Sequence, residues 1–267
     1  MDPVPDVEGA RSFRQPGEVY DLFMGRYSRS LAPVFADAAR VASGSTALDV
    51  GCGPGALTTV LVDRLGADVV TAVDPSEPFV ASCRDRNPGV DVRLGRAEDL
   101  PVDDASADVA LAQLVLHFTS DPAAAAAEMS RAVRPGGTVA ACVWDFAAGM
   151  EMLRVYWDAA LVVDPDAPDE ARTLRFGKPG EIADLFEAAG LVDVEESELS
   201  VSSTYRDLDE LWSGFLAGIG PAGTHCLSLA EDERARVRSE VGRRLGDPTG
   251  GFTLGALARC AVARRPG

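Results

Sequence analysis

The sequence predicts an open, doubly wound α/β sheet with a ligand site at the carboxyl end of its first strand. Residues 46–50 form a short apolar run, Gly51, Gly53 and Gly55 follow, and a helical pattern begins at Ala56. Strand, glycine turn and helix in this order build the ligand crevice of Rossmann-like sheets. The helix directs its free amide groups toward that crevice.

Apolar runs of strand length alternate with helical patterns along the chain, as in other α/β folds. Strands are expected over residues 46–50, 69–73, 90–94, 107–116, from 138 onward, 191–201 and 252–264. Helical patterns cover residues 18–29, 31–42, 56–65, an alanine-rich stretch after 121, 150–163, 178–189, 208–219 and 229–245. The run over 69–73 is continuously apolar, which is typical of a strand buried on both faces.

The glycine spacing alone leaves two classes of ligand open. Gly51, Gly53 and Ala56 fit the dinucleotide pattern G-x-G-x-x-G/A, and Asp74 follows near the expected distance. A nicotinamide or flavin oxidoreductase is therefore one reading. A carboxylate at the end of the second strand accepts hydrogen bonds from a ribose diol in either class.

Three motifs favour the other class. Asp49 opens an Asp-x-Gly-x-Gly-x-Gly motif, residues 97–101 read Ala-Glu-Asp-Leu-Pro, and residues 134–137 read Arg-Pro-Gly-Gly, which we interpret as a tight turn. Together they resemble the class I S-adenosylmethionine (SAM) dependent methyltransferases, of the bacterial small-molecule type with a type 11 methyltransferase domain. The resemblance is close over residues 20–144, and beyond them it is architectural.

The resemblance implies a seven-stranded sheet of order 3-2-1-4-5-7-6 with the last strand antiparallel. Residues 1–17 read as a loose arm, and residues 18–267 as one methyltransferase domain. Within it, residues 18–145 would bind SAM, residues 146–250 would contribute helices that cap the substrate, and residues 252–264 would form the last strand.

The resemblance also implies the cofactor contacts. The lead-in over residues 20–28, Tyr-Asp-Leu-Phe-Met-Gly-Arg-Tyr-Ser, would close over SAM, with Tyr20 and Arg26 near its carboxylate. An arginine suits that role because its planar fork matches a carboxylate. Arg96 stands where the family often has Asp, which leaves Glu98 or Asp99 to meet the adenine amine, and of these we choose Glu98. The remaining expected contacts are Asp49, Gly51, Gly53, Asp74, Pro75, Ala97 and Gln113.

His117 is the candidate for a catalytic base or for a group that orients the acceptor. It follows the fourth strand, where the activated methyl group should point, although a packing histidine is common at this position of the family. As a base it would give the pH–rate profile a limb near the ordinary histidine pKa of about 6.5. An apolar acceptor pocket is expected from Trp144, Trp212, Phe215 and His225.

Composition narrows the partners and the compartment. The net charge of −17 repels phosphate backbones, so no nucleic-acid partner is expected. Five scattered cysteines form no C-x-x-C pair, which argues against a disulfide framework or a zinc site and favours a reducing cytoplasm. No apolar run reaches the length of a membrane span. We therefore expect a cytoplasmic protein with no metal and no membrane partner.

The sequence thus predicts an enzyme that moves a methyl group from SAM to a small-molecule acceptor and releases S-adenosylhomocysteine (SAH). Two alternatives stay open at this stage. One is a noncatalytic SAM-binding protein, and the other is the nicotinamide or flavin oxidoreductase, against which the segment over 97–101 speaks.

Overall fold

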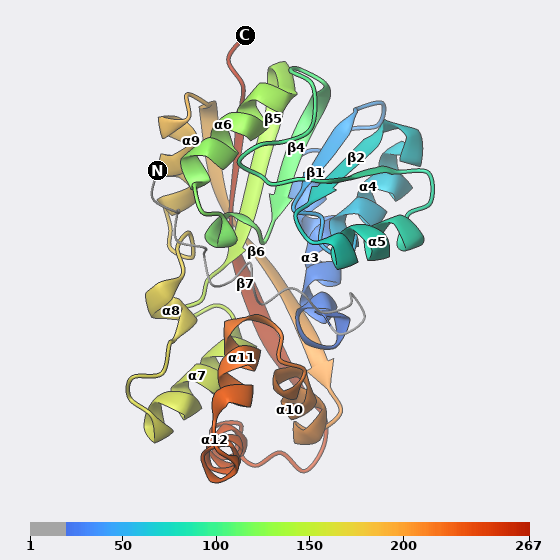
Figure 1. Cartoon of the computed structure of the whole chain (residues 1–267). Helices are drawn as coiled ribbons and strands as arrows, with labels where there is room; N and C mark the ends of the chain where they lie inside the picture. The colour runs from blue at the N-terminus through green and yellow to red at the C-terminus, as the bar shows by residue number, and fades with distance from the viewer. Residues whose placement is uncertain (1–19) are drawn as a thin grey trace, which may run out of the picture.

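The computed structural model describes residues 20–267 and contains a seven-stranded sheet with helices on both faces (Figure 1). The strand order is β3-β2-β1-β4-β5-β7-β6, which confirms the expected topology. β7 is antiparallel to β5 and to β6, and the other neighbouring pairs are parallel. The arm expected over residues 1–17 lies outside the described residues.

The strands are β1 (Ala47–Val50), β2 (Val70–Asp74), β3 (Asp91–Leu94), β4 (Ala107–Gln113), β5 (Val133–Trp144), β6 (Val192–Tyr205) and β7 (Phe252–Arg264). The helices that precede β5 are η1 (Asp21–Gly25), α3 (Arg26–Ala38), α4 (Ala56–Leu65), η2 (Ala67–Val69), α5 (Glu77–Arg86), η3 (Leu116–Phe118) and α6 (Pro122–Ala132). The later helices are α7 (Glu151–Val163), α8 (Glu170–Thr173), α9 (Glu181–Ala188), α10 (Leu208–Leu216), α11 (Gly220–Ser228) and α12 (Glu231–Arg244).

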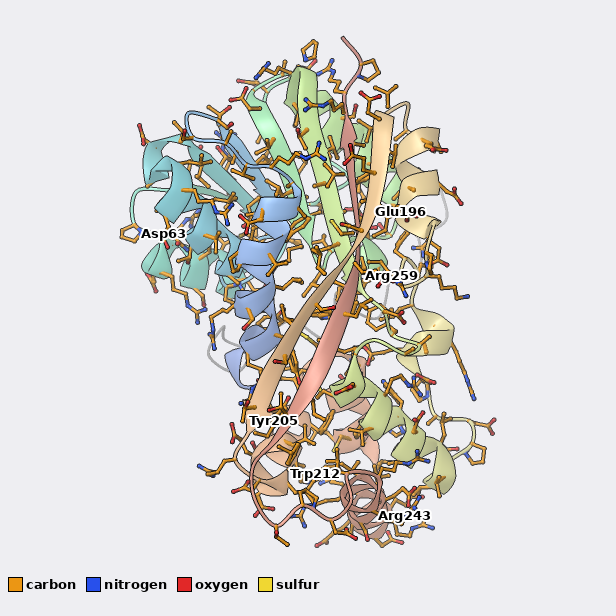
Figure 2. The ribbon with its side chains drawn as sticks, turned by 180° about the vertical axis from the view of Figure 1, so that it is seen from behind. Asp63, Glu196, Tyr205, Trp212, Arg243 and Arg259 are labelled. Atoms are coloured by element: carbon orange, nitrogen blue, oxygen red, sulfur yellow. The ribbon has the colours of Figure 1, made fainter. Side chains whose placement is uncertain are left out.

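The centre of the sheet is buried on both faces. All four residues of β1 are buried, and β1 pairs in parallel with β2 and β4. On one face α3 packs against α4, and on the other α6 packs against α9 (Figures 1 and 2). Because these helices cover the apolar faces, the polar site is confined to the carboxyl ends of the strands.

Three elements differ from the sequence-based expectation. The two helical patterns before β1 form one continuous helix, η1 followed by α3, with Pro33 inside it. β6 runs to Tyr205 instead of ending near residue 201. The Arg-Pro-Gly-Gly segment is no separate turn, because it forms an irregularity inside β5 where the register with β4 shifts.

The hairpin of β6 and β7 is longer than its neighbours in the sheet. β5 pairs with β7 as far as Trp144 opposite Ala258, whereas β6 and β7 stay paired as far as Tyr205 opposite Phe252. The hairpin therefore continues past the sheet and reaches the end of the molecule where α7, α10, α11 and α12 gather (Figures 1 and 2). The division into a SAM-binding part and a cap stays a prediction.

The helices at that end share an aromatic core. Phe215 is fully buried, stacks on Tyr156 with ring centroids 4.4 Å apart, and meets the edge of Phe23 at 5.4 Å. Phe23 belongs to η1, so this core joins the helices to the segment before β1. The neighbouring Leu216 on α10 is 42% exposed.

Phe215→Ala should lower the free energy of unfolding by about 3–5 kcal/mol, since the substitution leaves a cavity in this core. Leu216→Ala is the matched control and should change it by less than about 0.5 kcal/mol. Urea unfolding followed by circular dichroism measures both values. Equal effects of the two substitutions would contradict the packing described here.

Candidate active site

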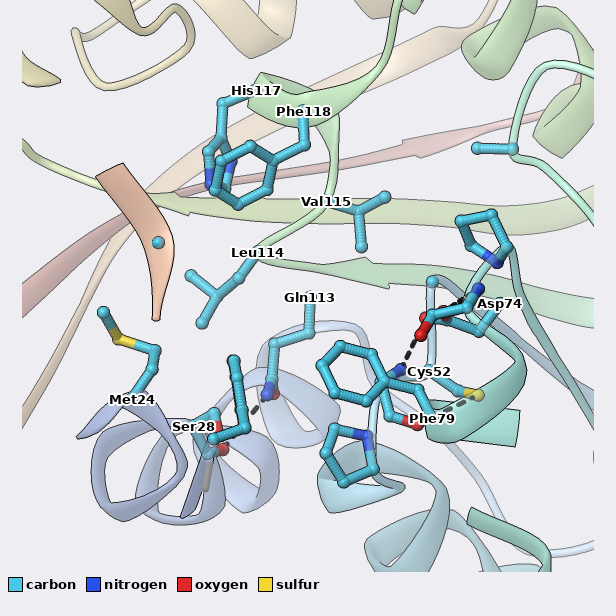
Figure 3. A pocket seen from close by; sticks show the side chains of 18 of the residues that line it. Met24, Ser28, Cys52, Asp74, Phe79, Gln113, Leu114, Val115, His117 and Phe118 are labelled. Atoms are coloured by element: carbon cyan, nitrogen blue, oxygen red, sulfur yellow. Dashed lines mark hydrogen bonds between the residues drawn. The ribbon is translucent and has the colours of Figure 1, made fainter. Parts of the chain in front are cut away.

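A cavity of about 610 Å³ opens at the carboxyl ends of β1, β2 and β4 (Figure 3). Its walls come from η1 and the start of α3, from the loops after β1, β2, β3, β4 and β5, and from α7, α8 and α11. Of the predicted site residues, ten line the cavity besides His117: Tyr20, Asp49, Gly51, Gly53, Asp74, Pro75, Ala97, Glu98, Gln113 and Trp144.

The turn after β1 requires glycine for two different reasons. Gly51 has φ +71°, and a Cβ on it would lie 2.4 Å from a methyl carbon of Val115. Gly53 has φ +53°, and a Cβ there would meet no atom within 4 Å. Gly51 thus permits close packing of the chain, whereas Gly53 leaves the backbone open to a ligand.

Asp49 is a buried carboxyl with one free oxygen. The Thr58 hydroxyl donates to Oδ2 at 2.6 Å, and Oδ1 has no hydrogen-bond partner among residues 20–267. Burial raises the pKa of Asp49 to about 8. A cationic ligand group beside Oδ1 would satisfy the orphaned oxygen and favour its ionised form.

Asp74 holds the glycine turn against the end of β2. The Gly53 N–H donates to Oδ2 and the Ser76 N–H donates to Oδ1, each at 2.8 Å (Figure 3). Burial raises the pKa of Asp74 to about 6, although both backbone bonds favour the ionised form. Each oxygen keeps a second lone pair, so the carboxylate can accept from a diol while it holds the turn.

Glu98 lines the cavity, but its carboxylate already has partners. The Ser120 N–H and hydroxyl both donate to Oε1 at 2.8 Å, and Arg96 Nε lies 3.5 Å from Oε2. These hydrogen bonds hold the pKa of Glu98 below its usual value despite burial, which opposes them. An adenine amine would have to share an oxygen with these donors, so the contact stays a prediction.

Gln113 ends β4 and ties it to the first helix. Its Nε2 donates to the Ser28 carbonyl at 3.0 Å, and its Oε1 has no partner among the described residues (Figure 3). A donor on a ligand could satisfy that oxygen. Gln113 therefore has an anchored end and a free end, as a positioning residue requires.

Some side chains of the lead-in segment line the cavity, and others point away from it. Tyr20, Phe23, Met24 and Ser28 line the cavity, and Tyr20 packs edge-on against Phe79 at 5.6 Å.

Arg26 points elsewhere. Its Nη2 lies 2.8 Å from Glu210 and donates to the Thr204 carbonyl, and its guanidinium lies 4.0 Å from the ring centroid of Tyr205. The prediction that Arg26 contacts the cofactor carboxylate is therefore wrong for this arrangement. Arg26 instead ties α3 to α10 and to the end of β6.

His117 lies in the cavity wall in η3, with its ring 3.9 Å from Phe118 and 5.2 Å from Phe146 between centroids. It is 3% exposed, and its Nδ1 has no partner among the described residues. Burial lowers the pKa of His117 to about 3. This pKa lies well below the ordinary histidine value on which the expected limb near pH 6.5 depends, and that limb stays a prediction. A neutral imidazole with a low pKa is a weak base but a good hydrogen-bonding group.

Three predicted pocket residues lie behind the cavity and do not line it. Trp212, Phe215 and His225 belong to the aromatic core, where the Tyr156 hydroxyl meets His225 Nδ1 at 2.8 Å. Their assignment to the acceptor pocket is wrong because α10 and α11 turn these side chains toward α7. Trp144 does line the cavity, with its Nε1 3.1 Å from Met24 Sδ.

Several residues of the wall were not predicted. They are Phe79, Phe118, Phe146, Leu153, Glu170 and Ile219 among others. They belong to separate helices and loops and carry no local motif.

The comparisons with known proteins agree with this geometry. Residues 48–141 match the family model described as a methyltransferase domain. Nocamycin O-methyltransferase of Saccharothrix syringae is 30% identical over 255 residues, which cover 85% of this chain and 87% of that protein. An uncharacterized methyltransferase of Mycobacterium bovis is 41% identical over 125 residues, or 46% of this chain and 50% of that protein. The chain thus spans about half the length of some curated relatives it matches.

Solved structures share the fold at low identity. Phosphoethanolamine N-methyltransferase 2 of Haemonchus contortus, determined with SAH, has a TM-score of 0.56 at 15% identity and is matched over 94% of this chain and 57% of that one. SpnF, a [4+2]-cyclase, has a TM-score of 0.54 at 22% identity, over 89% of this chain and 81% of that one.

Sheet order, cavity and relatives together define the class of protein as a Rossmann-like methyltransferase. The chain belongs to the class I SAM-dependent methyltransferases. Within residues 20–267, His, Cys, Asp and Glu form no group of three or more that could hold a metal ion. No helix in the same range is long and apolar enough to cross a membrane.

The residues of the cavity fit SAM, whose binding this fold implies. The orphaned Oδ1 of Asp49 suits the ammonium group, and Asp74 at the end of β2 suits the ribose diol. The open face of Gly53 leaves room for the ligand beside the backbone. Bound there, SAM would supply a methyl group on a positively charged sulfur.

The raised carboxyl pKa values predict how ligand stabilisation depends on pH. In the folded protein the pKa values of Asp49 (about 8) and Asp74 (about 6) lie above the unfolded value of about 4. Protonation of these two carboxyls therefore stabilises the free protein at low pH, and this stabilisation is lost as pH rises through about 6 for Asp74 and about 8 for Asp49. The ammonium of SAH favours ionised Asp49. The SAH-induced rise in Tm should therefore grow from pH 5.5 to 7.5.

Asp49→Asn should flatten that growth, because the amide cannot ionise. Differential scanning calorimetry at fixed SAH concentration measures the shift for both proteins. A shift that grows equally in the variant would assign the pH dependence to another group.

Bound SAH should slow hydrogen exchange in the first part of the lead-in segment. Tyr20, Phe23 and Met24 line the cavity, so the amides of residues 20–25 should exchange more slowly with SAH bound. Residues 31–38 of the same helix are the internal control and should exchange equally in both states. Hydrogen exchange by mass spectrometry measures both segments, and unchanged exchange over 20–25 would make the lead-in merely structural.

Proposed function

We propose that this protein transfers the methyl group of SAM to a small, largely apolar acceptor molecule. The observation that carries the proposal is the continuity of the cavity described above. This cavity runs from Asp49 and Asp74 at the ends of β1 and β2 to apolar residues supplied by β5, α7 and the start of α11. One continuous cavity allows donor and acceptor to meet away from water.

The acceptor half of the cavity is aromatic and aliphatic. It is lined by Phe118, Trp144, Phe146, Leu153 and Ile219. Methyl transfer is an in-line displacement, so the principal task of such walls is to align the acceptor with the methyl group. His117 stands among these residues as a neutral donor or acceptor of hydrogen bonds and would help to fix the acceptor's orientation.

Charge and relatives support a small molecule. The net charge of −17 disfavours nucleic acid, and a membrane surface rich in anionic lipids would be repelled as well. One of the relatives, nocamycin O-methyltransferase, is named for the transfer of a methyl group to an oxygen atom of a small molecule. Transfer to a hydroxyl is accordingly the reaction type we place first.

A noncatalytic or otherwise altered SAM-binding protein is the second candidate. SpnF has the same fold and is named a [4+2]-cyclase, so this architecture also occurs in a protein named for another reaction. The absence of a strong base at His117 is compatible with this candidate. Release of SAH in the presence of a panel of hydroxylated and amino-bearing small molecules, with SAM alone as the blank, separates the two candidates.

Asp74→Asn should weaken SAH binding at least tenfold, because hydrogen bonds to a charged group contribute about 1.5–3 kcal/mol. The amide oxygen can still hold one backbone N–H of the turn. Asp63→Asn, on the exposed side of α4, is the matched control and should leave the affinity unchanged (Figure 2). Isothermal titration calorimetry decides, and an unchanged dissociation constant in folded Asp74→Asn would remove Asp74 from the cofactor site.

A further inference from the structure

Glu170 places a buried carboxyl in the part of the cavity wall that comes from α7, α8 and the start of α11. It opens the short helix α8, is 4% exposed, and lines the cavity. The Trp157 indole N–H donates to Oε2 at 2.7 Å. Within residues 20–267 no donor is hydrogen-bonded to Oε1. A buried carboxyl with one oxygen held and the other oxygen free has a fixed direction and an unused acceptor.

The nearby cation is committed to other groups. Arg154 forms its ion pairs with Asp169 at 2.7 Å and with Asp158, and not with Glu170. Burial raises the pKa of Glu170 to about 7, with a smaller contribution from the Asp169 charge, whereas the Trp157 hydrogen bond and the Arg154 charge oppose the rise. The protein therefore keeps this carboxyl near the point where it can accept or release a proton at neutral pH.

Its supporting elements lie on the acceptor side. Trp157 and Leu153 are four residues apart on α7 and so share one face of that helix, and Leu153 lines the cavity. None of the predicted cofactor contacts belongs to α7 or α8. The Glu170 carboxyl thus supplies a hydrogen-bond acceptor to the wall of the cavity on this side.

We propose that Glu170 recognises a hydroxyl group on the acceptor and takes its proton during methyl transfer. The proposal rests on the proposed function. The acceptor oxygen forms a bond to the methyl carbon, the carbon–sulfur bond breaks with its electron pair going to sulfur, and the hydroxyl proton passes to the Glu170 carboxylate. The acceptor is thus an apolar molecule, of ring size suited to the aromatic walls, that carries one hydroxyl at the reacting position.

The test uses a pair of probes, 2-naphthol and 2-methoxynaphthalene, titrated into the full chain saturated with SAH. The two molecules share the ring system and differ in the hydroxyl donor. Wild-type protein should bind 2-naphthol at least tenfold more tightly, since a charge-assisted hydrogen bond forms with one probe only. Wild-type protein that binds both probes equally, or neither, would overturn the proposal.

Glu170→Gln is the informative variant because its amide oxygen can still accept from Trp157, which turns the NH₂ group toward the cavity. It should lose the preference for 2-naphthol and keep its SAH affinity and Tm. Glu151→Gln, an exposed carboxyl on the same helix as Trp157 and outside the cavity wall, is the control and should keep the preference. A folded Glu170→Gln that retains the preference, or that loses SAH affinity, would overturn the proposal.

Turnover of a hydroxylated acceptor from the panel gives a second readout. Glu170→Gln should lower kcat about 10²–10⁴-fold and remove the acidic limb of the pH–rate profile near 7, whereas a packing role would leave the profile unchanged. Failure of SAH to bind wild-type protein would count against the proposed function itself. Normal SAH binding without probe discrimination would count against this inference alone.

Discussion

The hydrogen bond from the Gly53 N–H to the Asp74 carboxylate is the contact on which the site depends most. It joins the glycine turn after β1 to the end of β2 at 2.8 Å. The turn can approach this closely because Gly51 and Gly53 adopt positive φ angles. The contact adds to the backbone pairing of the two strands, in which the Gly51 and Cys52 N–H groups both donate to the Val73 carbonyl. The carboxylate therefore organises the protein before it meets a ligand.

The order of the sheet and the cofactor side of the cavity could be predicted from the sequence because their signals are local. The Asp49 motif, the glycine turn and Asp74 fall within 26 residues of the chain. Each is placed by the strand it ends, so a resemblance in that segment transfers to the structure. Gln113 and Trp144 were likewise expected at the site, and both line the cavity from the ends of β4 and β5.

The errors concern residues whose partners are distant in sequence. Arg26 was assigned to the cofactor from its neighbours, yet its partner Glu210 lies 184 residues further along the chain. Trp212, Phe215 and His225 had the apolar character of a pocket wall, but the packing of α10 and α11 against α7 decides which way they face. Glu170 and Phe146 were missed for the same reason, since only the folded chain brings α8 and the loop after β5 to one cavity.

The insertion of β7 between β5 and β6 also determines the order in which the molecule can be assembled during synthesis. Among the strands of residues 20–267, β6 pairs with β7 alone, and it gains this neighbour when residues 252–264 become available, because β7 lies between β5 and β6. Until then the outer edges of β5 and β6 are both unpaired, and such edges attract other chains. A nascent chain is therefore expected to have its greatest tendency to aggregate just before its last strand leaves the ribosome.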